Sequence, residues 1–338
     1  MQHPIRFRPF LRPMVWGGRN LAALLAKPLP TADDYGEAWE VSDHASHRSV
    51  IADGPDAGRT LRDLLARDPH RLLGDPDHTA FPWLIKYLDA HDWLSVQVHP
   101  DEEAVRRLWP GEGSKTEAWF VLAARPDSRV YAGLQPGVDE AALRRAIAAG
   151  TVADLLHAFE PRPGDCLFLP AGTVHAVGGG VLIAEVQQTS DATFRLFDWN
   201  RRDASGKSRT LHIEEAIACI DWTAGPVHPV RASGYPQATD EPPAAEPVGQ
   251  ELVRCRYFHL DYIRQTTPFP VAGQGRLQTM LVLHGTGRYR SDAGPGILRP
   301  GDTVLLPAAL PPLTVEPDGP LGLLLSTLPP SPAARRCA

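Results

Sequence analysis

The sequence GDCLFLPAGTVH, residues 164–175, decides the fold of this chain. It follows a turn signal at residues 163–165, continues as a short apolar run at 166–169 and turns again at 170–172. This order of turn residues and apolar residues predicts two short strands joined by a tight connection. The second strand would present His175 to the inside of a barrel, where an imidazole is a natural metal ligand.

A second histidine lies in a segment of alternating polar and apolar side chains, WLSVQVHP at residues 93–100. Successive side chains of a strand point to opposite faces, so Gln97 and His99 share one face and the valines take the other. The next apolar strand opens with a carboxylate, Glu117. The pattern therefore predicts three further polar groups that can meet His175.

These four side chains form a donor set that suits a divalent ion. Gln97, His99, Glu117 and His175 supply one amide oxygen, two imidazoles and one carboxylate. Catalytic metal sites combine such ligands with an open position for water or substrate. Zinc is the first candidate, and other divalent metals stay open.

The opening segment also resembles a known motif, the second histidine motif of cupin barrels, G-x5-P-x-G-x2-H-x3-N. Gly179 stands where that motif has asparagine. The resemblance implies a mainly β protein built on a cupin barrel, that is, a double-stranded β-helix or jelly roll. The 34 prolines and 29 glycines, spread between short apolar runs, are typical of such a fold with many turns and few helices.

A longer series of motifs resembles the short bacterial form of the type I mannose-6-phosphate isomerases, which are cupins. The matching segments are WGG at 16–18, GEAWEVS at 36–42, FPWLIKYLDA at 81–90, SVQVHPDE at 95–102, SKTEAW at 114–119, LPAGTVH at 169–175 and EVQQTSDATFRLFDWNR at 185–201. They occur in the family's order between about residue 5 and residue 220.

This resemblance implies a metal-dependent aldose–ketose isomerase that interconverts mannose 6-phosphate and fructose 6-phosphate through an enediolate. It places one Zn²⁺ per chain on Gln97, His99, Glu117 and His175, and an active-site lysine and arginine at Lys115 and Arg195. Glycine commonly precedes that lysine, whereas this chain has Ser114. The reaction needs a base for the carbon acid and a cation near the developing oxyanion, and the residue types fit both needs.

Three cationic side chains are candidates for contact with the substrate. Arg195 offers a planar fork that suits two phosphate oxygens. Lys115 shares a strand face with Glu117, so a nearby dication would lower its pKa toward that of a general base, and simple phosphate binding is the alternative. Lys86 interrupts the apolar run 84–88, so it must be paired or line the active site, and we count it as substrate-binding.

Two other functions can use the same scaffold. A cupin dioxygenase would hold Fe(II) on two histidines and a carboxylate, but Gln97, Lys115 and Arg195 then have no role. A non-catalytic phosphosugar-binding cupin would be favoured if the metal or Arg195 were absent. The chain has no Gly-x-Gly-x-x-Gly after a strand and no Walker A sequence, so chemistry with a nucleotide cofactor has no support. The exact phosphosugar and the oligomeric state stay open.

Composition indicates a soluble cytoplasmic enzyme. The 338 residues carry a formal net charge of −6, without a basic stripe for nucleic acid. Prolines interrupt the basic N-terminus, so we expect no secretory signal, and no window reaches the ~18 apolar residues of a membrane span. The four cysteines, at positions 166, 219, 255 and 337, are too scattered for a disulfide scaffold or a zinc knuckle.

The chain divides into an N-terminal catalytic cupin domain (1–225), a Pro/Ala-rich linker (226–249) and a C-terminal degenerate cupin-like domain (250–330). The evidence for the last is an internal repeat. PGDTVLLPA at 300–308 matches PGDCLFLPA at 163–171 in six of nine positions. Pro312 stands where His175 would fall, so we expect the second unit to be metal-free and structural.

Helical patterns are few. They predict helices at 60–67 with Thr60 as N-cap, at 101–108, and as a pair at 139–148 and 152–159. In the C-terminal part, strands are expected at 252–264, 278–284 and 303–307.

Overall fold

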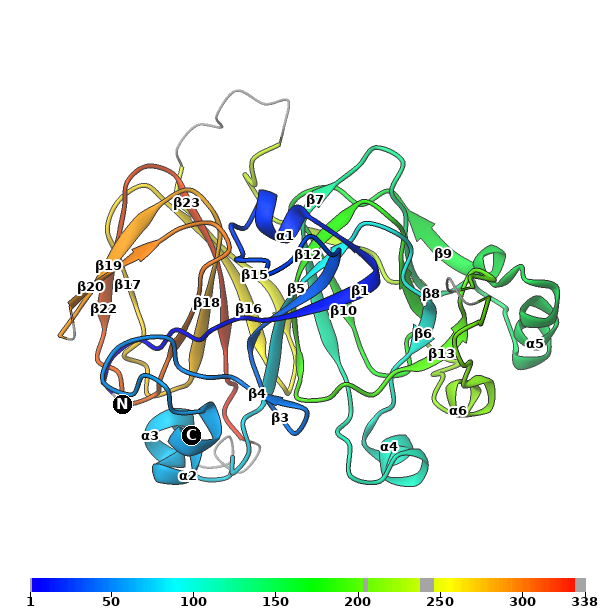
Figure 1. Cartoon of the computed structure of the whole chain (residues 1–338), viewed down its shortest axis with the longest axis horizontal. Coiled ribbons are helices and arrows are strands. Elements are labelled where there is room, and N and C mark those ends of the chain that lie inside the picture. Colours follow the sequence, from blue (N-terminus) through cyan, green and yellow to red (C-terminus); the bar gives the residue numbers. More distant parts are fainter. Residues whose placement is uncertain (1, 203–205, 238–245, 293, 332–338) are drawn as a thin grey trace.

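The structure is a computed structural model that describes residues 2–202, 206–237, 246–292 and 294–331. It consists mainly of antiparallel strands with a few short helices, so the expected mainly β fold with a cupin barrel is confirmed. Four sheets stand side by side along the long axis of the molecule (Figure 1).

The N-terminal part of the chain contributes two large sheets. The first has seven strands in the order β1 (Phe10–Gly18), β2 (Tyr35–Val41), β5 (Trp83–Ala90), β12 (Val181–Gln188), β7 (Glu117–Ala124), β10 (Asp165–Leu169) and β14 (Val230–Arg231). The second has five strands in the order β13 (Phe194–Phe197), β6 (Val96–Val98), β11 (His175–Val177), β8 (Val130–Leu134) and β9 (Leu156–Phe159). A small hairpin is formed by β3 (Asp43–His44) and β4 (His47–Arg48).

The C-terminal part contributes two more sheets. One has the order β15 (Val248–Arg254), β16 (His259–Gln265), β23 (Leu321–Thr327), β18 (Gln278–His284) and β21 (Thr303–Leu306). The other has the order β17 (Phe269–Val271), β22 (Leu313–Pro317), β19 (Gly287–Ser291) and β20 (Gly294–Leu298). The two repeated segments take similar places in their sheets. Strand β10 pairs with β7, which pairs with β12, and strand β21 pairs with β18, which pairs with β23.

Alternation along the strands builds the apolar layers between these sheets. In β7, Trp119 and Val121 face the five-stranded sheet of β6 and β11, and Ala118 and Phe120 face the opposite way. The outward residues pack on the sheet of β16 and β18, for example on Tyr262. One side of the seven-stranded sheet therefore lines the cupin barrel, and its other side packs on the first of the two C-terminal sheets.

The space between the two C-terminal sheets is filled with apolar side chains. Met280, Leu306 and Leu323 are fully buried there together with residues of the facing sheet such as Val315. The N-terminal segment also crosses to this unit, because Ile5 pairs with Leu305 on β21. The two units thus share backbone hydrogen bonds as well as an apolar core.

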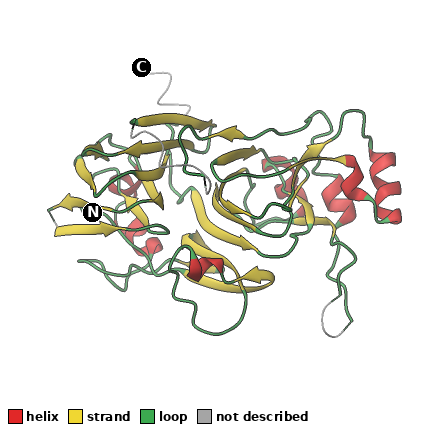
Figure 2. Ribbon diagram, turned by 90° about the horizontal axis from the view of Figure 1, so that it is seen from above, coloured by secondary structure: helices red, strands yellow, loops and turns green. Residues whose placement is uncertain are grey.

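The helices lie at the outside of the stacked sheets (Figure 2). They are α1 (Asn20–Ala23), α2 (Leu61–Arg67), α3 (Pro69–Leu73), α4 (Glu102–Leu108), α5 (Glu140–Ala149) and α6 (Ile213–Ile217). The helices expected at 60–67, 101–108 and 139–148 are confirmed, and Thr60, Asp101 and Asp139 cap them through their side chains. Helices α5 and α6 cover the outer face of the five-stranded sheet that contains β6, β8 and β13 (Figure 1).

Two expectations were wrong. Only a 3₁₀ turn, Val152–Leu155, occupies the start of the helix expected at 152–159, and the rest is β9, which pairs with β8. The strand expected at 252–264 is two strands, β15 and β16, joined by a turn in which the Cys255 amide donates to the Phe258 carbonyl at 3.1 Å. Both segments are apolar, as predicted. Pairing with distant strands, however, decided whether the first forms a helix or a strand and where the second is interrupted.

The centre of the expected linker, residues 238–245, lies outside the described residues. Its described flanks are in sheets, since β14 pairs with β10 and β15 begins at Val248. Across the described part of the chain, no helix is long and apolar enough to cross a membrane.

Candidate functional site

A pocket of about 300 Å³ opens between the two sheets of the first barrel. Its walls carry residues from the inward faces of both sheets, and many of these residues are charged. The charged side chains are Arg12, Glu37, Lys86, Lys115, Glu117, Glu185, Asp191, Arg195 and Arg209. The pocket therefore brings together segments that are far apart in the sequence, and it is the candidate active site.

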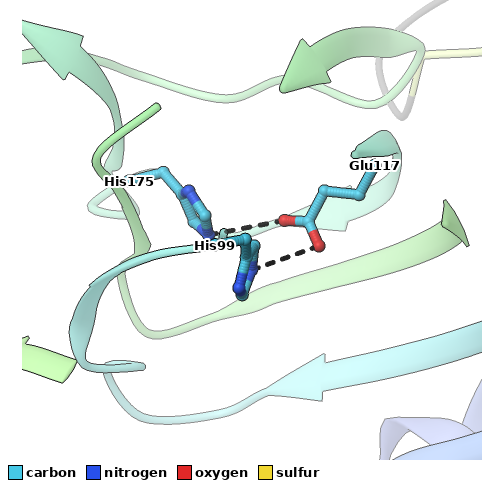
Figure 3. A group of neighbouring side chains, drawn as sticks. All are labelled: His99, Glu117 and His175. Atoms are coloured by element: carbon cyan, nitrogen blue, oxygen red, sulfur yellow. Dashed lines mark ion pairs between the residues drawn. The ribbon is translucent and has the colours of Figure 1, made fainter. Parts of the chain in front are cut away.

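At the inner end of the site, Glu117 lies between two histidines (Figure 3). Its Oε2 atom is 3.4 Å from His99 Nε2, and its Oε1 atom is 3.4 Å from His175 Nε2. All three side chains are at most 2% exposed, and their ligand atoms lie within 4.8 Å of one another. The structure thus brings these three residues together, as the sequence predicted.

Backbone carbonyls fix the orientation of both imidazoles. His99 Nδ1 lies 2.8 Å from the Ala192 carbonyl, and His175 Nδ1 lies 2.9 Å from the Thr173 carbonyl. A carbonyl oxygen only accepts, so Nδ1 carries the proton and Nε2 keeps its lone pair. Both lone pairs are directed toward Glu117, as is usual for histidines that bind a metal through Nε2.

The centre of this group has polar atoms without partners. His99 Nε2 and Glu117 Oε1 are buried and make no hydrogen bond to the described residues, and Glu117 Oε2 has only the Lys115 ammonium beside it, at 3.0 Å. Burying such atoms is costly unless something binds them. Two imidazole nitrogens and a carboxylate fit a divalent cation, so the residues present suit the metal that the sequence pattern predicted.

Burial keeps the two imidazoles neutral. It lowers the pKa of His99 to about 3, with the charge of Lys115 acting in the same direction, and it also lowers the pKa of His175. For Glu117, burial acts to raise the pKa, but the neighbouring Lys115 and His99 hold it well below its usual value. The contacts drawn in Figure 3 are therefore not ion pairs at neutral pH, and the group consists of neutral imidazoles around a carboxylate.

Gln97 lies next to this group, directly opposite His175 in the pair of β6 with β11. Its amide nitrogen is 3.3 Å from His175 Nε2, and its oxygen accepts from the Ser95 hydroxyl at 3.3 Å. The side chain is therefore where the sequence placed it. Coordination through its oxygen requires the amide to be turned over.

Lys115 contacts the same carboxylate, with Nζ 3.0 Å from Glu117 Oε2, although β7 begins only at Glu117 and Lys115 precedes the strand. Burial acts to lower the pKa of Lys115, but the charges of Glu117, Glu185 and Asp191 outweigh it and raise the pKa. The protein's own groups thus raise the pKa of Lys115, whereas a nearby dication was expected to lower it. Lys115 is a charged group held at the pocket wall.

The structure explains the lysine in the apolar run 84–88. Lys86 faces the pocket, whereas its neighbours Ile85 and Tyr87 face the core between the two units. Its Nζ lies 3.8 Å from both Glu185 and Asp191, and 5.0 Å from the centre of the Trp39 ring. Both alternatives therefore hold, since Lys86 is paired and also lines the pocket.

Arg195 lies on the edge strand β13, directly opposite Gln97. Its Nε donates to the Ser95 hydroxyl at 3.2 Å and its Nη1 to the Thr210 carbonyl at 2.8 Å. Both partners are neutral. Burial, followed by the charge of Arg209, lowers the pKa of Arg195, yet the guanidinium remains protonated.

Sequence reasoning missed several pocket residues. Glu185 is 3% exposed and lies directly opposite Lys86, and burial followed by the charge of Glu117 raises its pKa to about 7. Asp191 and Glu185 both lie in the segment EVQQTSDATFRLFDWNR at 185–201. Its resemblance to the family could have identified them as candidate site residues. Arg209 and His212 come from a stretch with no pattern, and nothing in the sequence singled them out.

Comparisons with known proteins relate the chain to one enzyme family. Residues 5–122 match the family model of the type I phosphomannose isomerase catalytic domain. The chain is 33% identical over 307 residues to the mannose-6-phosphate isomerase ManA of Bacillus subtilis, covering 91% of this chain and 94% of that protein.

Solved structures give the same result for the fold. The crystal structure of mannose 6-phosphate isomerase from Bacillus subtilis superposes with a TM-score of 0.81 at 27% identity, over 96% of this chain and 99% of that one. A mannose 6-phosphate isomerase solved with bound zinc and yttrium has a TM-score of 0.70 at 17% identity, over 95% and 98% of the two chains.

Proposed function

The chain belongs to the type I phosphomannose isomerase family, and from this premise we propose how its residues act. The protein is a metal-dependent aldose–ketose isomerase for mannose 6-phosphate and fructose 6-phosphate. The observation that carries this function is the buried group of His99, Glu117 and His175, whose carboxylate lines a pocket with both cationic and acidic side chains.

We propose that Gln97, His99, Glu117 and His175 hold one Zn²⁺. The two Nε2 lone pairs and the buried carboxylate between them support this assignment, and so does the zinc-bound mannose 6-phosphate isomerase of the same fold. A bound divalent ion supplies electrostatic stabilisation for an oxyanion that develops at C1 or C2 of the sugar.

The remaining residues position the sugar and move its proton. We propose that Lys115 takes part in proton transfer between C1 and C2, because its Nζ lies at the pocket wall beside Glu117. Arg195 binds the phosphate through its free guanidinium face. Lys86 contacts sugar hydroxyls from the opposite sheet, and Glu185 and Asp191 balance its charge.

Two statements about the rest of the protein belong to the same proposal. The unit that follows residue 250 is structural, because its barrel interior is filled with aliphatic side chains. The enzyme works in the cytoplasm, where hexose phosphates occur and where the unpaired thiols of Cys166, Cys219 and Cys255 stay reduced.

The test is turnover without any added nucleotide. Purified protein incubated with mannose 6-phosphate in D₂O forms fructose 6-phosphate, and proton transfer through an enediolate admits deuterium at C1 or C2. Chelation abolishes turnover and a divalent ion restores it. Full activity after complete removal of metal contradicts the metal role. Oxygen consumption with Fe(II) in place of isomerisation would support the dioxygenase instead.

A further inference from the structure

Most cations of the pocket are already matched by carboxylates. Arg12 lies 3.0 Å from Glu37 and 3.4 Å from Asp191. Lys86 and Lys115 are paired with Glu185 and Glu117 as described above. These three side chains have little charge to offer an incoming dianion unless an existing pair is broken.

The wall at the edge strand β13 is different. Among the described residues, no carboxylate lies within 4 Å of the Arg195 guanidinium, which donates only to neutral oxygens. Arg209 lines the same pocket and directly precedes Thr210, whose carbonyl accepts from Arg195 Nη1 at 2.8 Å, so the two cations come from adjoining segments. Two like charges at one wall are unfavourable by themselves and are typical of an anion site.

A buried carboxylate holds Arg209 in place. Arg209 Nε donates to Asp198 Oδ2 at 2.8 Å, and Nη2 donates to Asp198 Oδ1. Asp198 is 6% exposed, and burial acts to raise its pKa, but the hydrogen bonds from Arg209 and Arg201 lower it. This two-pronged contact fixes the plane of the guanidinium and leaves Nη1 without a partner in the described part of the chain.

The geometry points to Arg209 as a second phosphate-binding residue: we propose that it and Arg195 together grip the 6-phosphate, with Asp198 as the positioning residue of Arg209. This inference deepens the proposed function and rests on it. His212 lines the same wall, and its Nδ1 accepts from the Arg195 amide at 3.3 Å. Arg201 also contacts Asp198 and lies 3.5 Å from Asp92, so the three guanidinium groups exceed the two carboxylates by one charge, which a bound phosphate balances.

The position of this site also fits the length of the substrate. His175, Gln97 and Arg195 lie directly opposite one another on three neighbouring strands. Strands are about 4.8 Å apart, so the phosphate grip lies roughly 10 Å across the sheet from the metal ligand His175. A hexose 6-phosphate carries its reacting carbons and its phosphate at opposite ends of a six-carbon chain, which suits this separation.

The test compares Arg209→Gln with Arg201→Gln as a matched control. Arg201 also donates to Asp198, at 2.6 Å, but it does not line the pocket among the described residues. In Arg209→Gln we expect the KM for mannose 6-phosphate to rise about ten- to hundredfold, with kcat within about twofold and metal content unchanged. The inhibition constant of inorganic phosphate should rise in parallel. Arg201→Gln should change both constants by less than about threefold.

Arg209→Lys keeps the charge without the fork and should give an intermediate KM. The inference is overturned if Arg209→Gln changes KM and phosphate inhibition no more than Arg201→Gln does. If Arg209→Gln does not fold, Arg209→Lys takes its place. The inference is then overturned if Arg209→Lys has the KM and the phosphate inhibition constant of the wild type. Absence of isomerisation by the wild type would refute the proposed function instead. In that case calorimetric binding of inorganic phosphate to the wild type and to Arg209→Gln still decides the role of Arg209.

Discussion

Arg195 lies two strands away from His175 in one five-stranded sheet, with Gln97 in register between them. Two of the proposed metal ligands, Gln97 and His175, therefore lie on the same sheet as Arg195, whereas Glu117 comes from the facing seven-stranded sheet. Small errors in the relative position of the two ends of a substrate are costly in rate, and a shared sheet limits such errors.

Lys115→Ala and Arg195→Ala should impair the enzyme in different ways. A residue that grips phosphate equally in the ground and transition states mainly affects KM, whereas a proton-transfer residue affects kcat. We expect Arg195→Ala to raise KM about tenfold or more, and Lys115→Ala to lower kcat about a hundredfold or more. Steady-state kinetics at constant metal content measure both. A near-normal kcat in Lys115→Ala would end its assignment to proton transfer.

His175→Ala should remove tightly bound metal and nearly all activity from a folded protein. The imidazole is directed into the site rather than into the apolar layers, so the barrel core is retained. Metal analysis, with circular dichroism as a check on folding, measures the effect. Glu117→Gln is the graded comparison, because an amide oxygen still coordinates without the charge, and it should lose less metal. A full equivalent of metal in His175→Ala refutes this ligand.

The intact chain should bind one metal ion. The His/Glu cluster of the first barrel has no counterpart in the second among the described residues, and Pro312 precedes β22 at the position equivalent to His175. A proline side chain cannot coordinate a metal. Titration with Zn²⁺ monitored by calorimetry gives the stoichiometry, and two tight sites per chain would contradict the expectation.

Lys27→Met should destabilise the protein strongly. Lys27 Nζ lies 2.7 Å from Glu40 and donates at 2.7 Å to the Gly301 carbonyl of the second unit. Both side chains of this pair are under 10% exposed, so the variant leaves a buried carboxylate unpaired. Such losses cost about 3–5 kcal/mol in free energy of unfolding. Chemical denaturation measures the cost, and Lys27→Met combined with Glu40→Gln should recover a large part of it.

Stability should also fall in mild acid because of His284. Burial, helped by the charge of Arg264, lowers the pKa of His284 from 6.5 to about 4. Between these values the unfolded chain binds more protons at this position than the folded chain does, so the stability contribution is complete above the unfolded pKa and is lost as the pH falls toward 4.

The variant His284→Gln should reduce this pH dependence. Urea denaturation of the variant and the wild type at about pH 5 and about pH 7 gives the comparison. His284 is distant from the metal ligands, on the strand β18 of the second unit, and its Nε2 lies 3.1 Å from the Tyr262 hydroxyl. An unchanged slope in the variant would assign the acid sensitivity to other groups.

Local patterns in the sequence were sufficient for much of the first barrel. Alternation put Gln97 and His99 on one face, and turn chemistry around Gly164 placed His175 at the start of a strand. Caps at Thr60 and Asp139 marked the starts of two helices. These features depend on residues close in the chain, whose side-chain directions follow from the geometry of the strand or the helix turn.

Only the tertiary structure decided which distant residues meet in the pocket. Lys86 and Glu185 are separated by nearly a hundred positions and lie opposite each other solely through the pairing of β5 with β12. Arg209 reaches the wall beside Arg195 from a segment without periodicity. Strand register and loop placement depend on the packing of the whole barrel, so no local pattern specifies them. The sequence alone therefore determined the barrel type and the candidate metal ligands, and the fold determined the charge balance on which the proposed phosphate site rests.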